Sequence, residues 1–334
     1  MSPRRITIEE SERERMLDVL SRNAGFANPA EWLRRAAELG FQEVPASPVR
    51  SCPDCGHRSS ATVTRVLHYS TSIGLRRCLR CSLVFANTRI DAGTTSAHFE
   101  TAYKDEEYFA SGREAVFEQL AGLASDASPP GGRVLDIGGA KGHLLVKLRA
   151  ERPDLDLVLT DVSGVACRDA RERHGLFAVE GGLSAIEQLP GRFDVIVLSD
   201  VLYYEPELAR LWRAIVERLE PTGALVLRLP NRFWLTVIVE GVRSMFRSAK
   251  AKRVSESAFL FNPEHLYIFS RDYLARRLGS LGFVVEFRPS ALTRTRALRG
   301  LQDAWLRAAD AVWRVSGGAL TTTPSMIVVA RRPA

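Results

Sequence analysis

The residues that decide the fold are Arg133–His143, which read Arg-Val-Leu-Asp-Ile-Gly-Gly-Ala-Lys-Gly-His. An apolar run containing Asp136 leads into a glycine-rich turn and then into a helical pattern. Glycines let the backbone pass close to a ligand, and the start of the helix offers free N–H groups. A dinucleotide site would need Gly-x-Gly-x-x-Gly, but counting from Gly138 its other glycines fall on Ala140 and His143. The spacing therefore excludes the dinucleotide form, and Asp136 at the end of the apolar run puts a carboxylate where a cationic ligand could be met.

Strand-like and helix-like stretches alternate on the C-terminal side of this turn. The predicted strands are mostly apolar and cover 133–137, 155–160, 176–179, 193–198, 224–229, 283–287 and 326–330. The predicted helices between them include 144–150, 165–173, 208–219 and 273–281. Apolar strands alternating with helices are typical of a parallel sheet covered on both faces. We therefore predict an α/β fold with a Rossmann-like, doubly wound sheet.

Acidic residues follow two of these strands. Asp161 ends the second strand, 19 residues after Gly142, where a carboxylate can accept hydrogen bonds from both ribose hydroxyls of a nucleoside. The stretch Phe193–Tyr204 reads as the central fourth strand and its exit loop, which carries Asp200. In open α/β sheets, ligands bind outside the carboxyl ends of the strands.

Together with Gly223–Asn231, these motifs resemble the class I S-adenosyl-L-methionine (SAM)-dependent methyltransferases over about 200 residues, from Arg133 to the C-terminus. The resemblance implies a seven-stranded sheet with an antiparallel last strand. It places Gly138–Gly142 against the methionine part of SAM, Asp161 at the ribose and Asp200–Leu202 beside the sulfonium. The expected SAM-binding residues are Asp136, Gly138, Gly139, Ala140, Gly142, Asp161, Asp200, Val201, Leu202 and Tyr108. The family usually has glycine where Ala140 stands, and alanine in a glycine-like conformation costs about 1 kcal/mol.

Four cysteines precede this region as two Cys-x2-Cys pairs, separated by 22 residues: Cys52, Cys55, Cys78 and Cys81. Two such pairs can complete a tetrahedral site, which predicts bound Zn²⁺. Because the protein fills all four positions, we expect a structural zinc ion. The run Arg77–Asn87 is similar to the zinc-binding segment of a bacterial methyltransferase subgroup that includes sugar C-methyltransferases and natural-product enzymes. In that subgroup an aromatic stretch, matched here by Tyr103 and Tyr108-Phe109, helps to close the SAM pocket.

The chain is expected to contain four parts. Residues 1–48 form an N-terminal helical segment, residues 49–92 a zinc-binding knuckle and residues 93–130 a helical connector that closes the SAM pocket. Residues 131–334 form the methyltransferase domain, in which 231–262 is a candidate lid. The apolar and basic residues of 233–253 leave three interpretations open: a lid for a bulky or anionic substrate, a peripheral membrane contact, or a packing helix.

Methyl transfer requires alignment of the acceptor and removal of its proton when it has one. His265 is the candidate general base, because the pKa of histidine suits proton transfer near neutral pH. Glu264 precedes it, and the resemblance places such a Glu-His pair in the active site of sugar C-methyltransferases. A structural His265 that caps the following helix is the alternative. Tyr203 could contact the acceptor or only pack.

The charge and composition of the chain limit the classes of molecule that it is expected to bind. The net charge is +7, but the arginines are scattered and form no stripe, so we expect a small-molecule acceptor, which can be anionic or bulky, and no nucleic acid. The polar start and the absence of a long apolar run predict a cytoplasmic protein without a transmembrane segment. The alternatives are a ribosomal-RNA methyltransferase with a zinc module and a non-catalytic SAM-binding protein, the latter suggested by Ala140. The oligomeric state and the acceptor are left open.

Overall fold

The computed structural model describes residues 46–68, 71–90, 96, 99–100, 102–104, 112–231, 265–293 and 299–333. The chain divides into two compact units. The first unit holds the described residues before 96 together with 265–270, and the second holds those of 96–231 and 271–333. The helices expected in 1–48, Tyr108, Glu264 and nearly all of the 231–262 segment lie outside the described residues, and the four predicted domain boundaries stay predictions.

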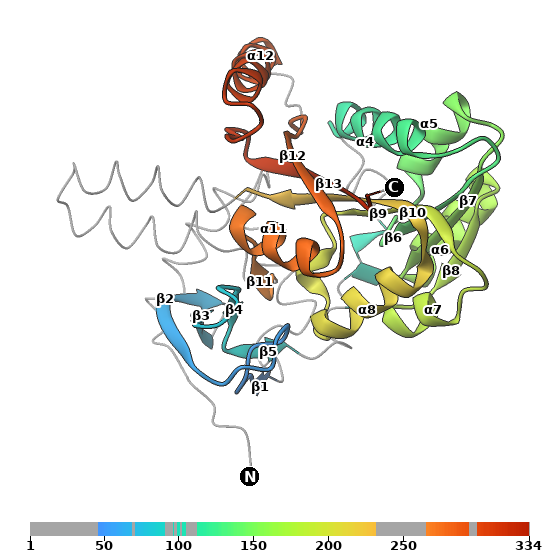
Figure 1. Ribbon diagram of the computed structural model, residues 1–334. Coiled ribbons are helices and arrows are strands. Elements are labelled where there is room, and N and C mark those ends of the chain that lie inside the picture. The colour runs from blue at the N-terminus through green and yellow to red at the C-terminus, as the bar shows by residue number, and fades with distance from the viewer. Residues whose placement is uncertain are drawn as a thin grey trace. The chain divides into compact units, whose positions relative to one another are not determined.

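The second unit is built on a seven-stranded sheet (Figure 1). Its strands are β6 (Arg133–Ile137), β7 (Asp156–Asp161), β8 (Phe177–Glu180), β9 (Phe193–Ser199), β10 (Leu219–Pro230), β12 (Val284–Pro289) and β13 (Ser325–Arg331). They are ordered β12-β13-β10-β9-β6-β7-β8. β13 lies between β10 and β12 and is antiparallel to both, whereas the other pairs are parallel. The predicted seven-stranded, doubly wound sheet with an antiparallel last strand is confirmed.

The strands form because their residues are apolar on both faces. In β9, Val195, Ile196 and Val197 are all fully buried, which is possible only where helices cover both sides of the sheet. Most predicted strand limits agree with the observed ones to within two residues. β10 is longer than expected, because it already pairs with β9 at Leu219 before a register shift leads to Ala224.

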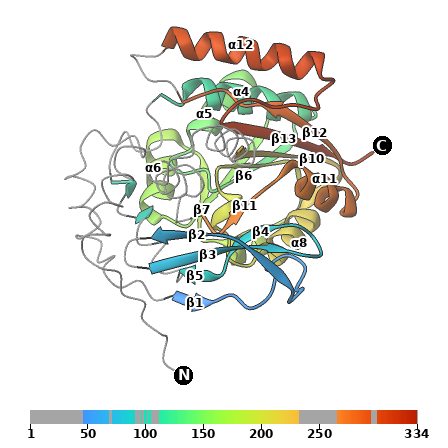
Figure 2. The same ribbon diagram turned by 90° about the vertical axis from the view of Figure 1, so that its left-hand side faces the viewer.

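Helices cover the two faces of this sheet. They are α4 (Glu114–Ala127), α5 (His143–Glu151), α6 (Gly164–His174), α7 (Leu183–Gln188), α8 (Leu208–Arg218), α11 (Arg271–Ser280) and α12 (Arg299–Val315). α4, α5 and α6 share one buried cluster with the sheet, and α8 and α11 lie on the opposite side (Figures 1 and 2). α7 was not predicted, and among the described residues of the connector expected over 93–130 the helix α4 runs from Glu114 to Ala127.

The first unit contains a four-stranded antiparallel sheet in the order β11-β4-β3-β2. Its strands are β2 (Ser60–His68), β3 (Thr71–Cys78), β4 (Val84–Ala86) and β11 (Tyr267–Ile268). β1 (Ala46–Pro48) and β5 (Thr88–Ile90) pair separately. Within the described ranges, no helix of either unit is long and apolar enough to cross a bilayer.

Candidate functional site

The glycine-rich turn joins β6 to α5 and is closed against the end of β7. The Gly138 N–H donates to the Thr160 carbonyl at 2.7 Å. Gly138 has φ +68° and Gly142, the N-cap of α5, has φ +83°, a region that favours glycine. A Cβ atom on Gly138 would lie 2.4 Å from Val201 Cγ2, and one on Gly142 would lie 2.3 Å from Leu176 Cδ1. Both positions therefore require glycine for close packing as well as for backbone conformation.

Ala140 adopts the left-handed conformation expected of a glycine, with φ +51°. Its N–H donates to Asp161 Oδ2 at 2.9 Å, a backbone hydrogen bond that a glycine would make equally. Its methyl group packs against a buried cluster formed by Phe99, Tyr103 and Ala166. This apolar packing, which glycine could not provide, offsets the backbone strain of alanine.

Asp161 is buried at the end of β7, and both of its carboxylate oxygens accept backbone N–H groups. Oδ2 accepts from Ala140 and Oδ1 from Ser163, each at 2.9 Å. Burial raises the pKa of Asp161 to about 6, although these N–H groups act in the opposite direction. Since each carboxylate oxygen can accept more than one hydrogen bond, capacity remains for ribose hydroxyls. The residue thus shapes the turn, a role that its position in the sequence did not reveal.

Asp136 lies within β6, and only 2% of its surface is exposed. Burial, followed by the charge of Asp161, raises the pKa of Asp136 to about 8. A carboxyl group with this pKa holds its proton at neutral pH. A cationic ligand beside it would favour the ionised form.

Asp200 follows β9, is buried with φ +60°, and forms ion pairs with two arginines. Its Oδ2 accepts from Arg113 at 2.5 Å and from the buried Arg228 of β10. Arg228 also donates through Nε to Ser290 Oγ at 2.8 Å. These contacts tie the exit loop of β9 to β10 and to the start of α4. The predicted placement of Asp200 beside a sulfonium stays a prediction.

The residues after Asp200 form a short 3-10 helix, Leu202–Tyr204, whose packing fixes the loop. Val201 contacts the turn at Gly138, and Leu202 and Tyr203 are buried. Tyr204 meets Phe99 edge-on, with ring centroids 5.2 Å apart. The burial of Tyr203 favours the packing role over acceptor contact.

Glu100 links the connector to the sheet edge where the turn lies. Ser163 Oγ donates to Glu100 Oε2 at 2.7 Å, and Val165 N–H donates to the same atom at 3.3 Å. Ser163 is the N-cap of α6, and the hydrogen bond from its hydroxyl is the main cause that lowers the pKa of Glu100. These contacts hold Phe99 and Tyr103 next to Ala140, and closure of a SAM pocket by the connector stays a prediction.

His265 lies in the first unit and is buried. The residues that follow it form β11, in which Tyr267 pairs with Phe85 and Ile268 with Val84 of β4. The segment after His265 thus belongs to the sheet that contains β3 and β4, a pairing that the sequence did not predict. The role of His265 as a base stays a prediction.

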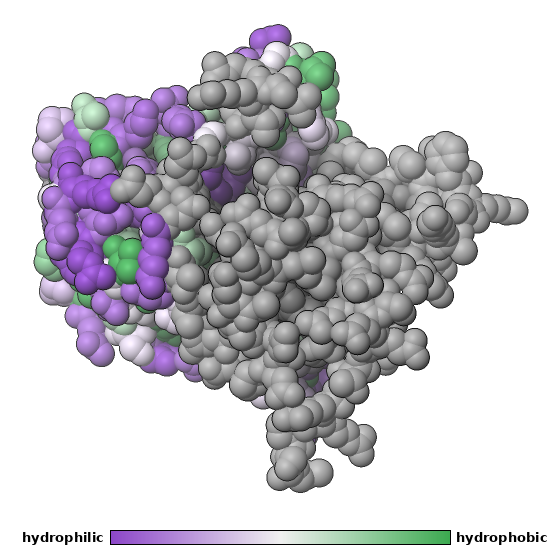
Figure 3. Space-filling model, turned by 180° about the vertical axis from the view of Figure 1, so that it is seen from behind, coloured by the Kyte–Doolittle hydropathy of each residue, from purple (hydrophilic) through white to green (hydrophobic). Residues whose placement is uncertain are grey.

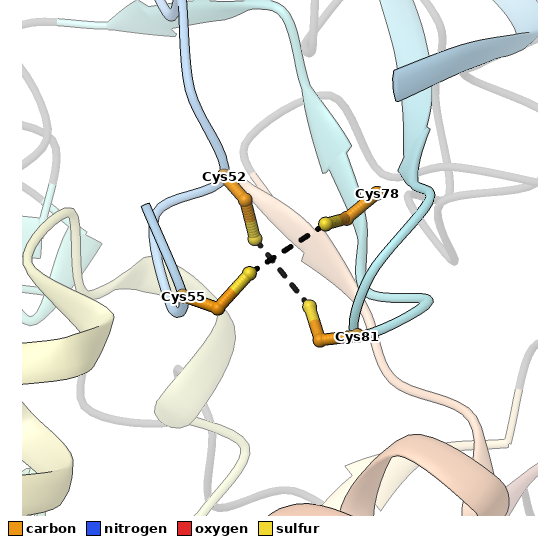
Figure 4. A group of neighbouring side chains, drawn as sticks. All are labelled: Cys52, Cys55, Cys78 and Cys81. Atoms are coloured by element: carbon orange, nitrogen blue, oxygen red, sulfur yellow. Dashed lines mark hydrogen bonds between the residues drawn. The ribbon is translucent and has the colours of Figure 1, made fainter. Parts of the chain in front are cut away.

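The four cysteines converge as predicted, and their Sγ atoms all lie within 4.8 Å of one another (Figure 4). Cys52 Sγ is 3.5 Å from Cys81 Sγ, and Cys55 Sγ is 3.6 Å from Cys78 Sγ. A disulfide requires about 2.05 Å, so these are free thiols. Four thiolates at about 2.3 Å from a zinc ion would be about 3.8 Å apart, which fits this arrangement.

The two Cys-x2-Cys turns have the same backbone form. In each, the N–H of the fourth residue after the first cysteine, Gly56 or Ser82, donates to that cysteine's carbonyl. Both residues are left-handed, with φ +70° and +65°. Each first cysteine also donates its N–H to the carbonyl of the fifth residue after it. Two like turns facing each other are what a tetrahedral site needs. A glycine such as Gly56 indicates a left-handed residue in the first turn, whereas the serine at position 82 does not indicate one in the second turn.

The closeness of the four thiols shifts the pKa values of individual cysteines. Burial raises the pKa of Cys55 to about 11, whereas a hydrogen bond from Cys52 lowers the pKa of Cys81 to about 5. Cys81 therefore ionises readily in this cluster, whereas Cys55 tends to keep its proton. A divalent cation would supply the missing positive charge.

The chain matches the sequence model of a family described as "Methyltransferase domain" over residues 108–286, which is more than half of its length. The chain belongs to this methyltransferase family. Its strand order, the antiparallel β13 and the glycine turn at the end of β6 agree with a class I SAM-dependent methyltransferase. The four cysteines fit a zinc-binding segment ahead of that domain.

Individual relatives are more distant. A release factor glutamine methyltransferase of Rhodospirillum rubrum is 35% identical over 120 residues, which cover 30% of this chain and 36% of the relative. The methyltransferase thus spans about a third of the length of the curated relative it matches. The plantazolicin methyltransferase BpumL shares 13% identity over 73% of this chain and 92% of its own, with a TM-score of 0.45. The magnesium protoporphyrin IX methyltransferase of Synechocystis PCC 6803 shares 16% over 73% and 100%, with a TM-score of 0.46. Scores this low do not bear on this enzyme's substrate.

Several residues of the methyltransferase site were not predicted, namely Glu100, Arg113, Ser163, Arg228 and Ser290. Only Arg228 left a signal, because an arginine inside the apolar run Leu225–Leu229 must find a buried partner. The others act through contacts between segments that are far apart in the sequence.

Proposed function

We propose that this methyltransferase transfers the methyl group of SAM to an oxygen or carbon atom of a small-molecule acceptor, in natural-product or glycan biosynthesis. The observation that carries the proposal is the turn at the end of β6, where positive-φ glycines meet two buried carboxyl groups, Asp136 and Asp161. The acceptor atom attacks the methyl carbon in line as the methyl–sulfur bond breaks, and S-adenosylhomocysteine leaves.

The protein's part in this reaction is binding, alignment and proton removal. Gly138, Gly139 and Gly142 bring bare backbone to the cofactor, and Asp161 accepts the ribose hydroxyls. Asp136 meets a cationic group, while Asp200–Leu202 shape the loop beside the sulfonium. Ala140 contributes its position in the turn, and Tyr108 belongs to the aromatic stretch that covers SAM.

His265 is the proposed general base for the acceptor proton, with Glu264 as its orienting partner. The support is the ordinary pKa range of histidine and the burial of its side chain, which holds it in one place. We expect His265→Gln to lower turnover at least about 100-fold, the usual contribution of a general base, and to leave SAM affinity unchanged. His174→Gln, at the end of α6, is the matched control. Unchanged turnover in His265→Gln would refute the assignment.

We assign structural Zn²⁺ to Cys52, Cys55, Cys78 and Cys81. The support is the spacing of the sulfur atoms and the two like turns that carry them. With four protein ligands the ion would have no open position for substrate, so its contribution is to the fold of the first unit.

The class of acceptor is tested separately. The enzyme is incubated with methyl-labelled SAM and candidate metabolites, and the labelled products are identified by mass spectrometry. Segment 231–262 is the candidate cover of the acceptor. A labelled small molecule supports the proposal. Labelled RNA, together with RNA binding at physiological salt, would support the ribosomal-RNA alternative instead.

A further inference from the structure

α12 presents an apolar face that the described residues of its own unit leave exposed. Leu301, Trp305, Ala308, Val312 and Val315 are all exposed, with Leu301 72% and Val315 91% accessible. Their spacing is 4, 3, 4 and 3 residues, which places them on one side of the helix. Hydrophobic residues are visible at the top of Figure 3, the end of the molecule at which Figure 1 labels α12. Residues of this size and number on one exposed helix face indicate a binding surface.

The other side of α12 is anchored, so the helix holds this face in a defined position. Ala309 is buried, and Trp313 Nε1 donates to the Phe287 carbonyl of β12 at 2.6 Å. Trp305 of the exposed face is itself held in place, because its Nε1 donates to the Thr322 carbonyl at 3.2 Å. The guanidinium of Arg288 lies over the Trp313 ring. Rigid presentation lowers the entropy cost of binding a partner.

The spacing and charge favour a helical partner over a lipid surface. A repeat of 3.5 residues is the seam that pairs one helix with another. Helices that lie in a membrane surface are rich in Lys and Arg on the polar side. α12 has three arginines against two aspartates, and Asp310 neutralises Arg314 at 2.8 Å. No charged residue lies within the apolar face itself.

The apolar face of α12 is complementary to the same face of a second, antiparallel copy of the helix. Around Ala308, an antiparallel copy places Leu301 opposite Val315, Trp305 opposite Ala311, and Ala308 opposite Ala308. Ala304, which is also exposed, then faces Val312. Near the axis, large side chains thus meet small ones, and the small central residue permits close approach, while Leu301 and Val315 pack together at each end. A two-fold axis produces this kind of self-matching contact.

We propose that α12 is the contact of a homodimer in which the α12 helices of two copies pack antiparallel, centred on Ala308. A helix of 17 residues is about 25 Å long. Such a pair reaches only the lower end of specific interfaces, near about 1,000 Å² in total, so we expect a reversible dimer. The proposal concerns assembly and does not depend on the acceptor.

Sedimentation of the full-length chain over a concentration series tests the dimer. We expect the wild type to dimerise and Ala308→Arg to shift the dissociation constant upward by at least 100-fold, because two like charges then meet on the axis. Ala150→Arg, at an exposed position of α5, is the matched control and should dimerise like the wild type. A wild type that stays monomeric at the highest concentration, or an Ala308→Arg variant that still dimerises, would overturn the proposal.

Cysteine cross-linking tests the antiparallel arrangement. Ala308→Cys should form a covalent dimer under mild oxidation above the wild-type background. Leu301→Cys alone should not, because 14 residues of helix separate positions 301 and 315 by about 21 Å. A mixture of Leu301→Cys and Val315→Cys chains should cross-link. Cross-linking of Leu301→Cys by itself, or an Ala308→Cys yield no higher than that of Ala150→Cys, contradicts the arrangement. Flotation of wild-type monomer with anionic vesicles would assign the face to a membrane and overturn the dimer.

Discussion

Gly138 shows why the glycine-rich turn between β6 and α5 needs a residue without a side chain. Its φ of +68° and the 2.4 Å approach of Val201 Cγ2 to an added Cβ mean that alanine meets both strain and overlap. We expect Gly138→Ala to lower the free energy of unfolding by about 2 kcal/mol or more. The control is Gly122→Ala within α4, where an added Cβ contacts nothing within 4 Å and should stabilise by about 0.5–1 kcal/mol. Urea unfolding measures both, and equal effects would contradict this view of the turn.

Asp136 predicts a pH dependence of stability. Its pKa is raised to about 8 in the folded chain, so the folded state binds more protons than the unfolded state above the ordinary aspartate pKa. The stability that Asp136 contributes is complete below pH 4 and is lost as the pH rises through about 8. Each pH unit in this window costs up to about 1.4 kcal/mol. Asp136→Asn should remove this decline in ligand-free protein, measured by urea unfolding from pH 5 to 8.5. Superimposable profiles of variant and wild type would refute it.

At the scale of elements, the ion pair between Arg228 and Asp200 joins β10 to the loop after β9. Arg228→Met leaves the buried Asp200 with Arg113 as its remaining ion-pair partner, so the change should cost about 2 kcal/mol of unfolding free energy. Asp200→Asn keeps a residue that tolerates positive φ and removes the charge. In that background Arg228→Met should cost at least about 1 kcal/mol less. Additive effects in the double-mutant cycle would show that the pair is not coupled.

The two Cys-x2-Cys turns lead to a second prediction at the scale of elements. We expect the purified chain to hold one Zn²⁺, and Cys55→Ser to lose it and to destabilise the β2–β4 sheet. Cys167→Ser should retain the ion, because Cys167 is buried in the other unit with its thiol directed to the Asp161 carbonyl. Elemental analysis by mass spectrometry distinguishes the two. A Cys55→Ser chain that keeps full zinc content would remove the assignment.

Across the whole molecule, local patterns predicted the large sheet well and the polar contacts poorly. The buried strands and the glycine turn follow from residues adjacent in sequence, so their positions were readable. β3 was missed because Thr71–Cys78 mixes polar and basic residues with few apolar ones. The pairing of β11 with β4 brings together segments about 180 residues apart, and nothing in either segment signals it. The same holds for Glu100 with Ser163, whose contact depends on the folded sheet edge.

The most direct test of the central claim is a calorimetric titration of the full-length, ligand-free chain with SAM. We expect saturable binding of one SAM per chain, weakened at least about tenfold in Asp161→Asn, because the loss of its charge weakens hydrogen bonds to both the turn and the ribose. Absence of binding to the wild type would contradict the cofactor site at the end of β6 and, with it, the methyl-transfer function.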